Sequence, residues 1–371
     1  MDKPISILFC GDVLISPKTV SASISLELQS LFNRCDLVGI NLEAPITTCR
    51  KKIKKAGPNI YQSEKCVSIL REWGVTLVNC ANNHIMDYGE FALKETLNNL
   101  SEFVVVGAGM NFEEAYQLKK IVLNNRTLGF LSFAEGGYGM IANDSSSEAG
   151  YAWINHNRTN EIIKKSAFEC DYLLVQVHAG VEEINIPLPE WRARYKELID
   201  LGASAVICSH PHIPQGVEVY KSAPIFYSLG NFFFEYSEAN NIERSFITEL
   251  LIQEGKIEYF IYPIERVNSF VSLCIDSDYK SYLKCLNEYL LEPSYSQLLE
   301  ENINNLWKDR YKPMLLNSFN GIEQFSMIRI LKIIKRLFCR TSINDDLFHH
   351  LLFIESHLWT INRALLQKRK K

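Results

Sequence analysis

The sequence predicts an α/β fold followed by a helical C-terminal region. Short apolar runs recur between residues 5 and 227 with helix-like segments between them, a pattern typical of buried strands in an α/β domain. Hydrophobic residues make up 47% of the 371 positions and charged residues 22%, which is sufficient for a sizeable core. From about residue 269 onward the strand-like runs stop, and we expect helices there.

The predicted strands are short and apolar, and each is flanked by polar or turn-forming residues. They cover residues 5–10, 37–40, 75–80, 103–106, 128–133, 172–177, 205–208 and 225–227. Two longer runs at 246–252 and 257–262 flank a Glu-Gly pair at 254–255 and predict a hairpin. Helices are expected at 64–73, 90–100 and 190–201, the last of which ends before Gly202, a common helix stop.

Helix-like segments dominate the C-terminal part of the chain. They cover residues 279–310, 322–341 and 347–368, separated by Pro313, the Asn-Gly pair at 320–321 and a polar stretch at 341–346. We therefore expect two domains, residues 1–268 and a helical region of residues 269–371. Residues 327–340 alternate apolar with basic side chains. Such a helix either makes peripheral contact with an anionic membrane or packs its apolar side on neighbouring helices.

Charge and cysteine usage narrow the class of protein. The formal net charge is −4, so no nucleic-acid partner is expected, because nucleic-acid binders are usually basic. The apolar run at 5–10 is shorter than the core of a signal peptide. We expect a cytoplasmic protein, with peripheral membrane association through 327–340 as the alternative. The ten cysteines include no C-x-x-C pair, which favours reduced thiols over disulfides.

Polar side chains that can bind metal ions follow the predicted strands. They are Asp12, Asn41, Glu43, Asn82, Asn83, His84, His178, His210 and His212. The carboxyl ends of strands form the ligand-binding edge of an open α/β sheet. Carboxylate, amide and imidazole donors suit Mn, Fe, Zn or Mg, and one carboxylate can bridge two ions. The sequence thus predicts one or two divalent ions, although each residue alone would also fit a turn or a helix cap.

Seven motifs occur in a fixed order along the first 232 residues. They are G-D-V at 11–13, N-L-E at 41–43, A-N-N-H-I-M-D-Y-G at 81–89, G-A-G at 107–109, H-A-G-V-E at 178–182, H-P-H-I-P-Q-G-V-E at 210–218 and Y-S-L-G-N-F at 227–232. With these motifs, residues 1–265 resemble the CapA-type capsule (poly-γ-glutamate) biosynthesis family, which is similar to the calcineurin-like metallophosphoesterases. The resemblance implies a metallophosphoesterase-like αββα sandwich, two sheets flanked by helices, with a two-metal site at the strand ends.

The resemblance also implies roles for individual residues. Asp12 and His212 would ligate one ion, and Glu43 would bridge it to a second ion ligated by Asn83, His178 and His210. His84 would be the catalytic general acid, oriented by Asp87, for which a helix cap is the alternative role. Six residues would line the pocket, although a structural role is at least as reasonable for several of them: Asn41, Asn82, Glu182, Gln215, Glu218 and Asn231.

The expected function is that of a metal-dependent, phosphoesterase-like hydrolase in the biosynthesis of capsule or a poly-γ-glutamate-type cell-surface polymer. The expected substrate is an acidic polymer or a phosphorylated small molecule. The chain departs from the phosphoesterase pattern at Leu14, where a histidine is usual. The alternative is therefore a non-catalytic accessory protein that binds an acidic polymer or a partner enzyme in capsule synthesis.

Overall fold

The computed structural model describes residues 3–19, 21–144, 147–235, 242–253, 255–320 and 344–369. The predicted helix at 322–341 and its membrane-binding segment 327–340 lie outside the described residues. Contacts group the chain into two compact units, residues 1–53 with 59–295, and residues 54–58 with 296–371. The domain boundary predicted at residue 268 stays a prediction.

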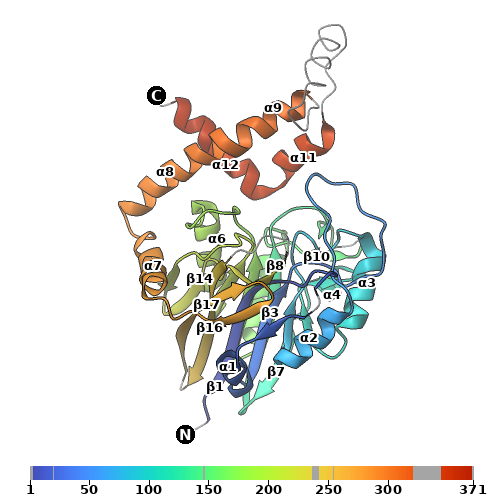
Figure 1. The fold of residues 1–371 in the computed structure, drawn as a ribbon, viewed down its shortest axis with the longest axis vertical. Helices are drawn as coiled ribbons and strands as arrows, with labels where there is room; N and C mark the ends of the chain where they lie inside the picture. Colours follow the sequence, from blue (N-terminus) through green and yellow to red (C-terminus); the bar gives the residue numbers. More distant parts are fainter. Residues whose placement is uncertain are drawn as a thin grey trace. The chain divides into compact units, whose positions relative to one another are not determined.

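The first unit contains a large mixed sheet (Figure 1). Its strand order is β2-β18-β17-β16-β1-β3-β4-β5, and β15 pairs with β1 off this path. Strands β1, β3, β4 and β5 run parallel, whereas β16, β17 and β18 are antiparallel. The strands are β1 (Ile5–Leu14), β2 (Ser23–Ile24), β3 (Leu37–Leu42), β4 (Leu77–Asn79), β5 (Val104–Val106), β15 (Asn231–Phe234), β16 (Ile242–Gln253), β17 (Lys256–Val267) and β18 (Phe270–Leu273).

A second sheet has the order β13-β14-β12-β11-β8-β7. Its central strands β8, β11, β12 and β14 are parallel, so their carboxyl ends share one edge. The strands are β7 (Lys119–Leu123), β8 (Arg126–Ala134), β11 (Tyr172–His178), β12 (Ala205–Ser209), β13 (Val217–Tyr220) and β14 (Ala223–Phe226). A small third sheet contains β6 (Ala108–Gly109), β9 (Met140–Ile141) and β10 (Gly150–Ala152).

The two large sheets pack against each other, and helices cover their outer faces. One apolar cluster joins the sheets through Phe9 of β1, Phe130 of β8 and Phe226 of β14. A second cluster joins the large sheet to α1 (Leu26–Arg34) and α2 (Lys65–Trp73), for example through Phe32 and Trp73. Helices α5 (Thr159–Phe168) and α6 (Pro189–Asp200) pack on the second sheet. The predicted αββα sandwich is therefore confirmed.

The remaining helices of the first unit are α3 (Gly89–Asn99), α4 (Phe112–Ala115) and α7 (Ser277–Glu288). One sequence expectation was wrong, since strands do not stop at residue 269: β18 follows and pairs with β17. The predicted helix at 279–310 is also interrupted, because α7 ends before Pro293 and α8 (Ser294–Leu306) begins after it. Proline lacks the N–H that a continuous helix requires.

The described part of the second unit contains residues 54–58, α8 from residue 296 onward, and further helical segments. These are the π-helical turn η1 (Trp307–Tyr311), α9 (Lys312–Asn320), α11 (Asp345–Phe353) and α12 (Glu355–Arg369). Buried Tyr311 and His357 form a hydrogen bond of 2.9 Å inside this unit. Among the described residues of the whole chain, no helix is both long and apolar enough to cross a membrane.

Candidate metal centre

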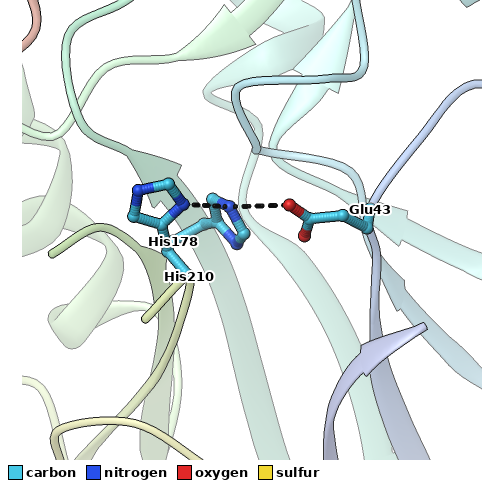
Figure 2. Close-up of side chains that lie close together, drawn as sticks. All are labelled: Glu43, His178 and His210. Carbon is cyan, nitrogen blue, oxygen red and sulfur yellow. Dashed lines mark hydrogen bonds and ion pairs between the residues drawn. The ribbon is translucent and has the colours of Figure 1, made fainter. Parts of the chain in front are cut away.

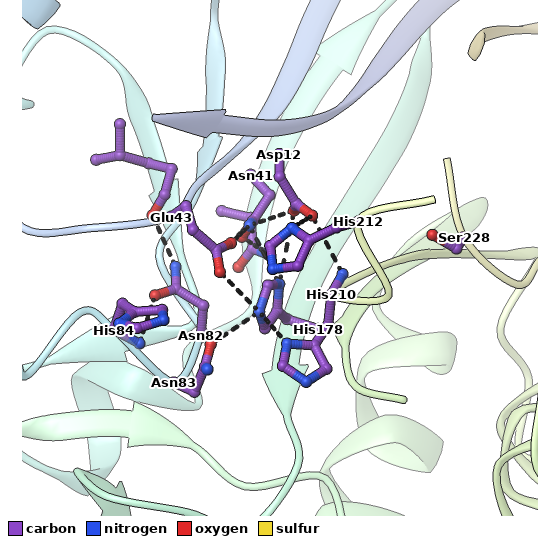
Figure 3. A network of polar contacts seen from close by, with 12 residues as sticks. Asp12, Asn41, Glu43, Asn82, Asn83, His84, His178, His210, His212 and Ser228 are labelled. Carbon is purple, nitrogen blue, oxygen red and sulfur yellow. Dashed lines mark hydrogen bonds and ion pairs between the residues drawn. The ribbon is translucent and has the colours of Figure 1, made fainter. Parts of the chain in front are cut away.

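The polar residues that follow the predicted strands converge at one edge of the sandwich (Figure 3). Asp12 and Asn41 come from β1 and β3 of the large sheet, whereas His178 comes from the end of β11 in the second sheet. His210 and His212 follow β12. Both sheets therefore supply side chains to one network, as expected where the carboxyl ends of parallel strands meet.

The end of β1 is held in place by an unusually close backbone contact. A Cβ atom on Gly11 would lie 1.7 Å from the carbonyl oxygen of Gly230, so only glycine fits there. The next residue, Asp12, donates its backbone N–H to the same oxygen at 3.2 Å. The ladder between β1 and β3 is irregular between Phe9 and Asp12, and such bulges commonly redirect a side chain near a site. The Asp12 side chain is fully buried.

The Asn41 amide links the two carboxylates of the network. Its Nδ2 donates to Asp12 Oδ1 and to Glu43 Oε2, both at 2.7 Å, and lies 3.1 Å from Nδ1 of His178. Its Oδ1 accepts a 2.9 Å hydrogen bond from Asn79. These bonds fix which way the amide faces and place Asn41 within the network, and its pocket role stays a prediction.

Glu43, His178 and His210 form the centre of the network (Figure 2). One potential ligand atom from each lies within 4.8 Å of the others, and all three side chains are buried. His178 Nε2 is 3.4 Å from Glu43 Oε1 and 3.0 Å from His210 Nδ1. Glu43 Oε1 is buried and accepts no hydrogen bond, which is costly for a carboxylate unless another group, such as a cation, contacts it.

Three further predicted residues border this centre. Asn83 Oδ1 lies 3.0 Å from His178 Nε2, so an amide oxygen joins the same group of atoms. His212 Nδ1 lies 3.5 Å from Asp12 Oδ2 and 3.0 Å from Asn231 Oδ1. His178 Nδ1 also lies 3.7 Å from Asp12 Oδ1, so the side chains around Asp12 and those around His178 form one continuous network.

His84 and Asp87 form a hydrogen-bonded pair beside the centre. Nδ1 of His84 lies 2.7 Å from Oδ2 of Asp87, and Asp87 is fully buried. The same carboxylate oxygen accepts the backbone N–H of Ile60 at 2.8 Å, which fixes its position. With Nδ1 paired to Asp87, proton transfer to a substrate would take place at the other ring nitrogen, Nε2.

Other predicted pocket residues form hydrogen bonds or ion pairs with neighbouring segments. Asn82 donates to the Leu42 carbonyl at 2.7 Å and accepts the backbone N–H of His84. Gln215 donates to the carbonyl oxygens of residues 184 and 186. Glu218 pairs with Arg192, and Glu182 lies near enough to His210 to influence it electrostatically. The proposed pocket roles of Asn82, Glu182, Gln215 and Glu218 stay predictions.

Burial and neighbouring charges perturb the titration of the centre. Burial raises the pKa of Asp12, and the nearby negative charge of Glu43 raises it further. Burial opposes ionisation of Glu43 too, but His178 outweighs it and lowers the pKa of Glu43 to about 2. Burial lowers the pKa of His210, yet the Glu135 carboxylate overcomes this and raises it to about 9. The buried carboxylates of Asp12 and Glu43 give the site negative charge that a bound cation would compensate.

Glu135 is a buried residue of the network that the motifs did not single out. It is 2% exposed, and its Oε1 lies 3.2 Å from Nε2 of His210. It lies two positions after the predicted strand at 128–133. The other candidate site residues were selected because they also lie just after predicted strands. Applying that criterion to every strand would have found it.

Comparisons with known proteins agree with the motif pattern. Residues 6–236 match the family model described as bacterial capsule synthesis protein PGA_cap. The chain is 29% identical to a PGA biosynthesis protein CapA of Bacillus subtilis over 279 residues, covering 71% of this chain and 72% of that protein. It is 33% identical to a capsule biosynthesis protein CapA of Bacillus anthracis over 244 residues, covering 62% of this chain and 58% of that protein.

A loose structural likeness is also found. A solved 5'-nucleotidase from Candida albicans is 11% identical to the chain, with a TM-score of 0.41. The match covers 82% of this chain and 58% of that structure. The assignment of the fold rests on the two sheets and their helices described above.

Proposed function

Because the chain belongs to the PGA_cap family of bacterial capsule synthesis proteins, we propose that it is a metal-dependent hydrolase in the biosynthesis of capsule or a related cell-surface polymer. The observation that carries this proposal is the buried Oε1 atom of Glu43, which accepts no hydrogen bond and faces Nε2 of His178 at 3.4 Å. A buried carboxylate oxygen and imidazole nitrogens in such proximity are what a divalent cation requires.

The donor set fits a divalent ion. Glu43, Asn83, His178 and His210 would hold one ion through two oxygen and two nitrogen atoms. Asp12 and His212, with Glu43 shared, would hold a second. A bound ion would act as a Lewis acid and stabilise negative charge at the centre under attack. The donors suit Mn, Fe, Zn or Mg, and thiols are absent from the group.

The chain's own residues supply the remaining functions. His84 would deliver a proton from Nε2 to the leaving oxygen, while Asp87 holds its Nδ1 at 2.7 Å. Asn41 would keep the carboxylates of Asp12 and Glu43 apart and oriented through its two 2.7 Å hydrogen bonds. The substrate we propose is a phosphorylated small molecule or an acidic polymer, and we expect no nucleic acid.

The experiment that tests this function combines elemental analysis of the purified protein with hydrolysis of a generic aryl phosphate. One or two divalent ions per chain together with metal-dependent turnover are the expected result. Turnover that a chelator does not affect, or a protein that binds no divalent ion, would contradict the proposal.

The second candidate function is a non-catalytic accessory that binds an acidic polymer or a partner enzyme. Leu14 favours it, because this residue of β1 is 3% exposed and offers no ligand atom two positions after Asp12. The group around Asp12 is then poorer in neutral nitrogen donors than the group around His178. An ion bound without any turnover would favour the accessory role.

A further inference from the structure

One imidazole of the metal centre contacts a carboxylate that lies outside every family motif. Glu135 follows β8, and its Oε1 lies 3.2 Å from Nε2 of His210. Its backbone N–H donates to the carbonyl oxygen of His178 at 3.1 Å, so the main chain that carries Glu135 is tied to the end of β11. The side chain is 2% exposed. Burying a carboxylate is energetically costly unless a polar or charged group contacts it.

The contact defines the state of the His210 ring. The contact is an ion pair of 3.2 Å, and the negative charge of the carboxylate beside Nε2 favours a hydrogen on that nitrogen. In the neutral imidazole the lone pair is then on Nδ1. Nδ1 lies 3.0 Å from His178 Nε2, and His210 belongs to the group that contains Glu43 and His178. Glu135 thus leaves His210 with its metal-binding atom turned into the centre.

The backbone of His210 is fixed independently of Glu135. Its N–H donates to Asp12 Oδ2 at 3.3 Å, and its φ of +101° lies in a region that residues with a side chain rarely adopt. The backbone therefore fixes the position of the Cβ atom from which the ring extends. The contact with Glu135 fixes the rotation of the ring and which nitrogen faces the centre.

We propose that Glu135 is a positioning residue for the metal centre, which selects the Nε2–H tautomer of His210 and directs Nδ1 toward the ion. The inference deepens the proposed function and rests on it where metal affinity is concerned. Carboxylates that hold a metal-ligating histidine in this way typically contribute 10- to 100-fold to metal affinity.

The test compares Mn²⁺ binding by the full-length wild-type protein, Glu135→Gln and Glu135→Ala, followed through the electron paramagnetic resonance signal of free Mn²⁺. Glu249→Gln is the matched control. Glu249 is 7% exposed and bonded to Ser6, Arg34 and Tyr262, all outside the centre. We expect Glu135→Gln to weaken Mn²⁺ binding by about 10-fold, Glu135→Ala by about 100-fold, and Glu249→Gln to leave it unchanged.

A second measurement needs no Glu135 variant and no metal. At pH 10, above the His210 pKa of about 9, the ¹⁵N spectrum of histidine-labelled, metal-free wild-type protein reports the tautomer of the neutral imidazoles, and His210→Gln assigns the His210 signals. We expect the Nε2–H form for His210. An Nδ1–H form, or Mn²⁺ affinities that are equal in wild type and both Glu135 variants, would overturn the inference. Failure of the wild type to bind any metal would instead overturn the proposed function, and the tautomer would still test Glu135.

Discussion

At the scale of single residues, a substitution of His84 can distinguish a role in catalysis from a role in metal binding. It pairs with Asp87 and does not belong to the group formed by Glu43, His178 and His210. Its charge nevertheless lowers the pKa of Glu43, which places the imidazole close to the centre. A residue beside an ion but not bound to it is well placed to transfer a proton.

We therefore expect His84→Ala to retain the metal content of the wild type and to reduce turnover of an aryl phosphate by about 10²- to 10⁴-fold. Asp87→Asn should have a smaller effect, because the imidazole stays in place but loses its charged partner. Metal content is measured by elemental analysis and turnover by release of the phenol. Unchanged turnover in His84→Ala would remove this residue from the mechanism, and lost metal would assign it a structural role.

A second prediction at this scale concerns Glu218, whose carboxylate contacts Arg192, Lys196 and Tyr227 at 2.7–3.1 Å. Burial would raise the pKa of Glu218, but these partners outweigh it and lower the pKa from 4.5 to about 2. The ionised side chain therefore stabilises the folded protein above pH 4.5, and this stabilisation is lost as the pH falls toward 2.

Glu218→Gln should lower the free energy of unfolding by roughly 1.5–3 kcal/mol at pH 7, the usual effect of losing hydrogen bonds to a charged group. The difference between variant and wild type should shrink at pH values below 4.5. Urea unfolding at pH 7, 5 and 4 measures it. A difference that is constant, or that grows in acid, would contradict this account of Glu218.

At the scale of elements, the sequence predicted best where a strand is apolar throughout. The runs at 37–40, 172–177 and 205–208 became β3, β11 and β12, because buried parallel strands have no polar side to interrupt the pattern. Short strands such as β6, β9 and β18 were missed, since two to four residues contain too little pattern to distinguish them from loops. The candidate site residues lie at or just after strand ends, but the contacts between elements, such as Glu135 with His210, depend on the fold.

The close packing around β1 predicts how much stability is lost when Gly11 or Gly39 is replaced by alanine. A Cβ on Gly11 would overlap the Gly230 backbone, whereas a Cβ on Gly39 would meet the Phe9 ring at 2.9 Å, a side chain that can move. Gly11→Ala should cost more than about 3 kcal/mol, because backbone cannot shift without displacing Asp12. Gly39→Ala should cost about 1–3 kcal/mol. Urea unfolding measures both, and equal losses would mean that β1 and β15 adjust more freely than their contact implies.

At the scale of the whole molecule, the candidate metal centre lies where the two sheets meet. Glu43 follows β3 in the large sheet, whereas His178 and His210 come from β11 and the segment after β12 in the second sheet. These ligand candidates are separated by 135 and 32 positions along the chain. In the unfolded chain they would rarely meet, so an ion should bind the folded state almost exclusively.

Binding of this kind must raise thermal stability. At a free Mn²⁺ concentration 100 times the dissociation constant, the folded protein should gain about 2.7 kcal/mol, and a chelator should remove the gain. His178→Ala should abolish the Mn²⁺-dependent rise in melting temperature, because it deletes the nitrogen that lies nearest to Glu43, Asn83 and His210 together. His156→Ala is the control, since His156 is 5% exposed and its ring packs at a tilt against Phe112, away from the centre. It should lower the melting temperature but keep the Mn²⁺-dependent rise. Calorimetry measures both effects, and an equal rise in wild type and His178→Ala would show that Mn²⁺ stabilises the protein elsewhere than at the junction of the sheets.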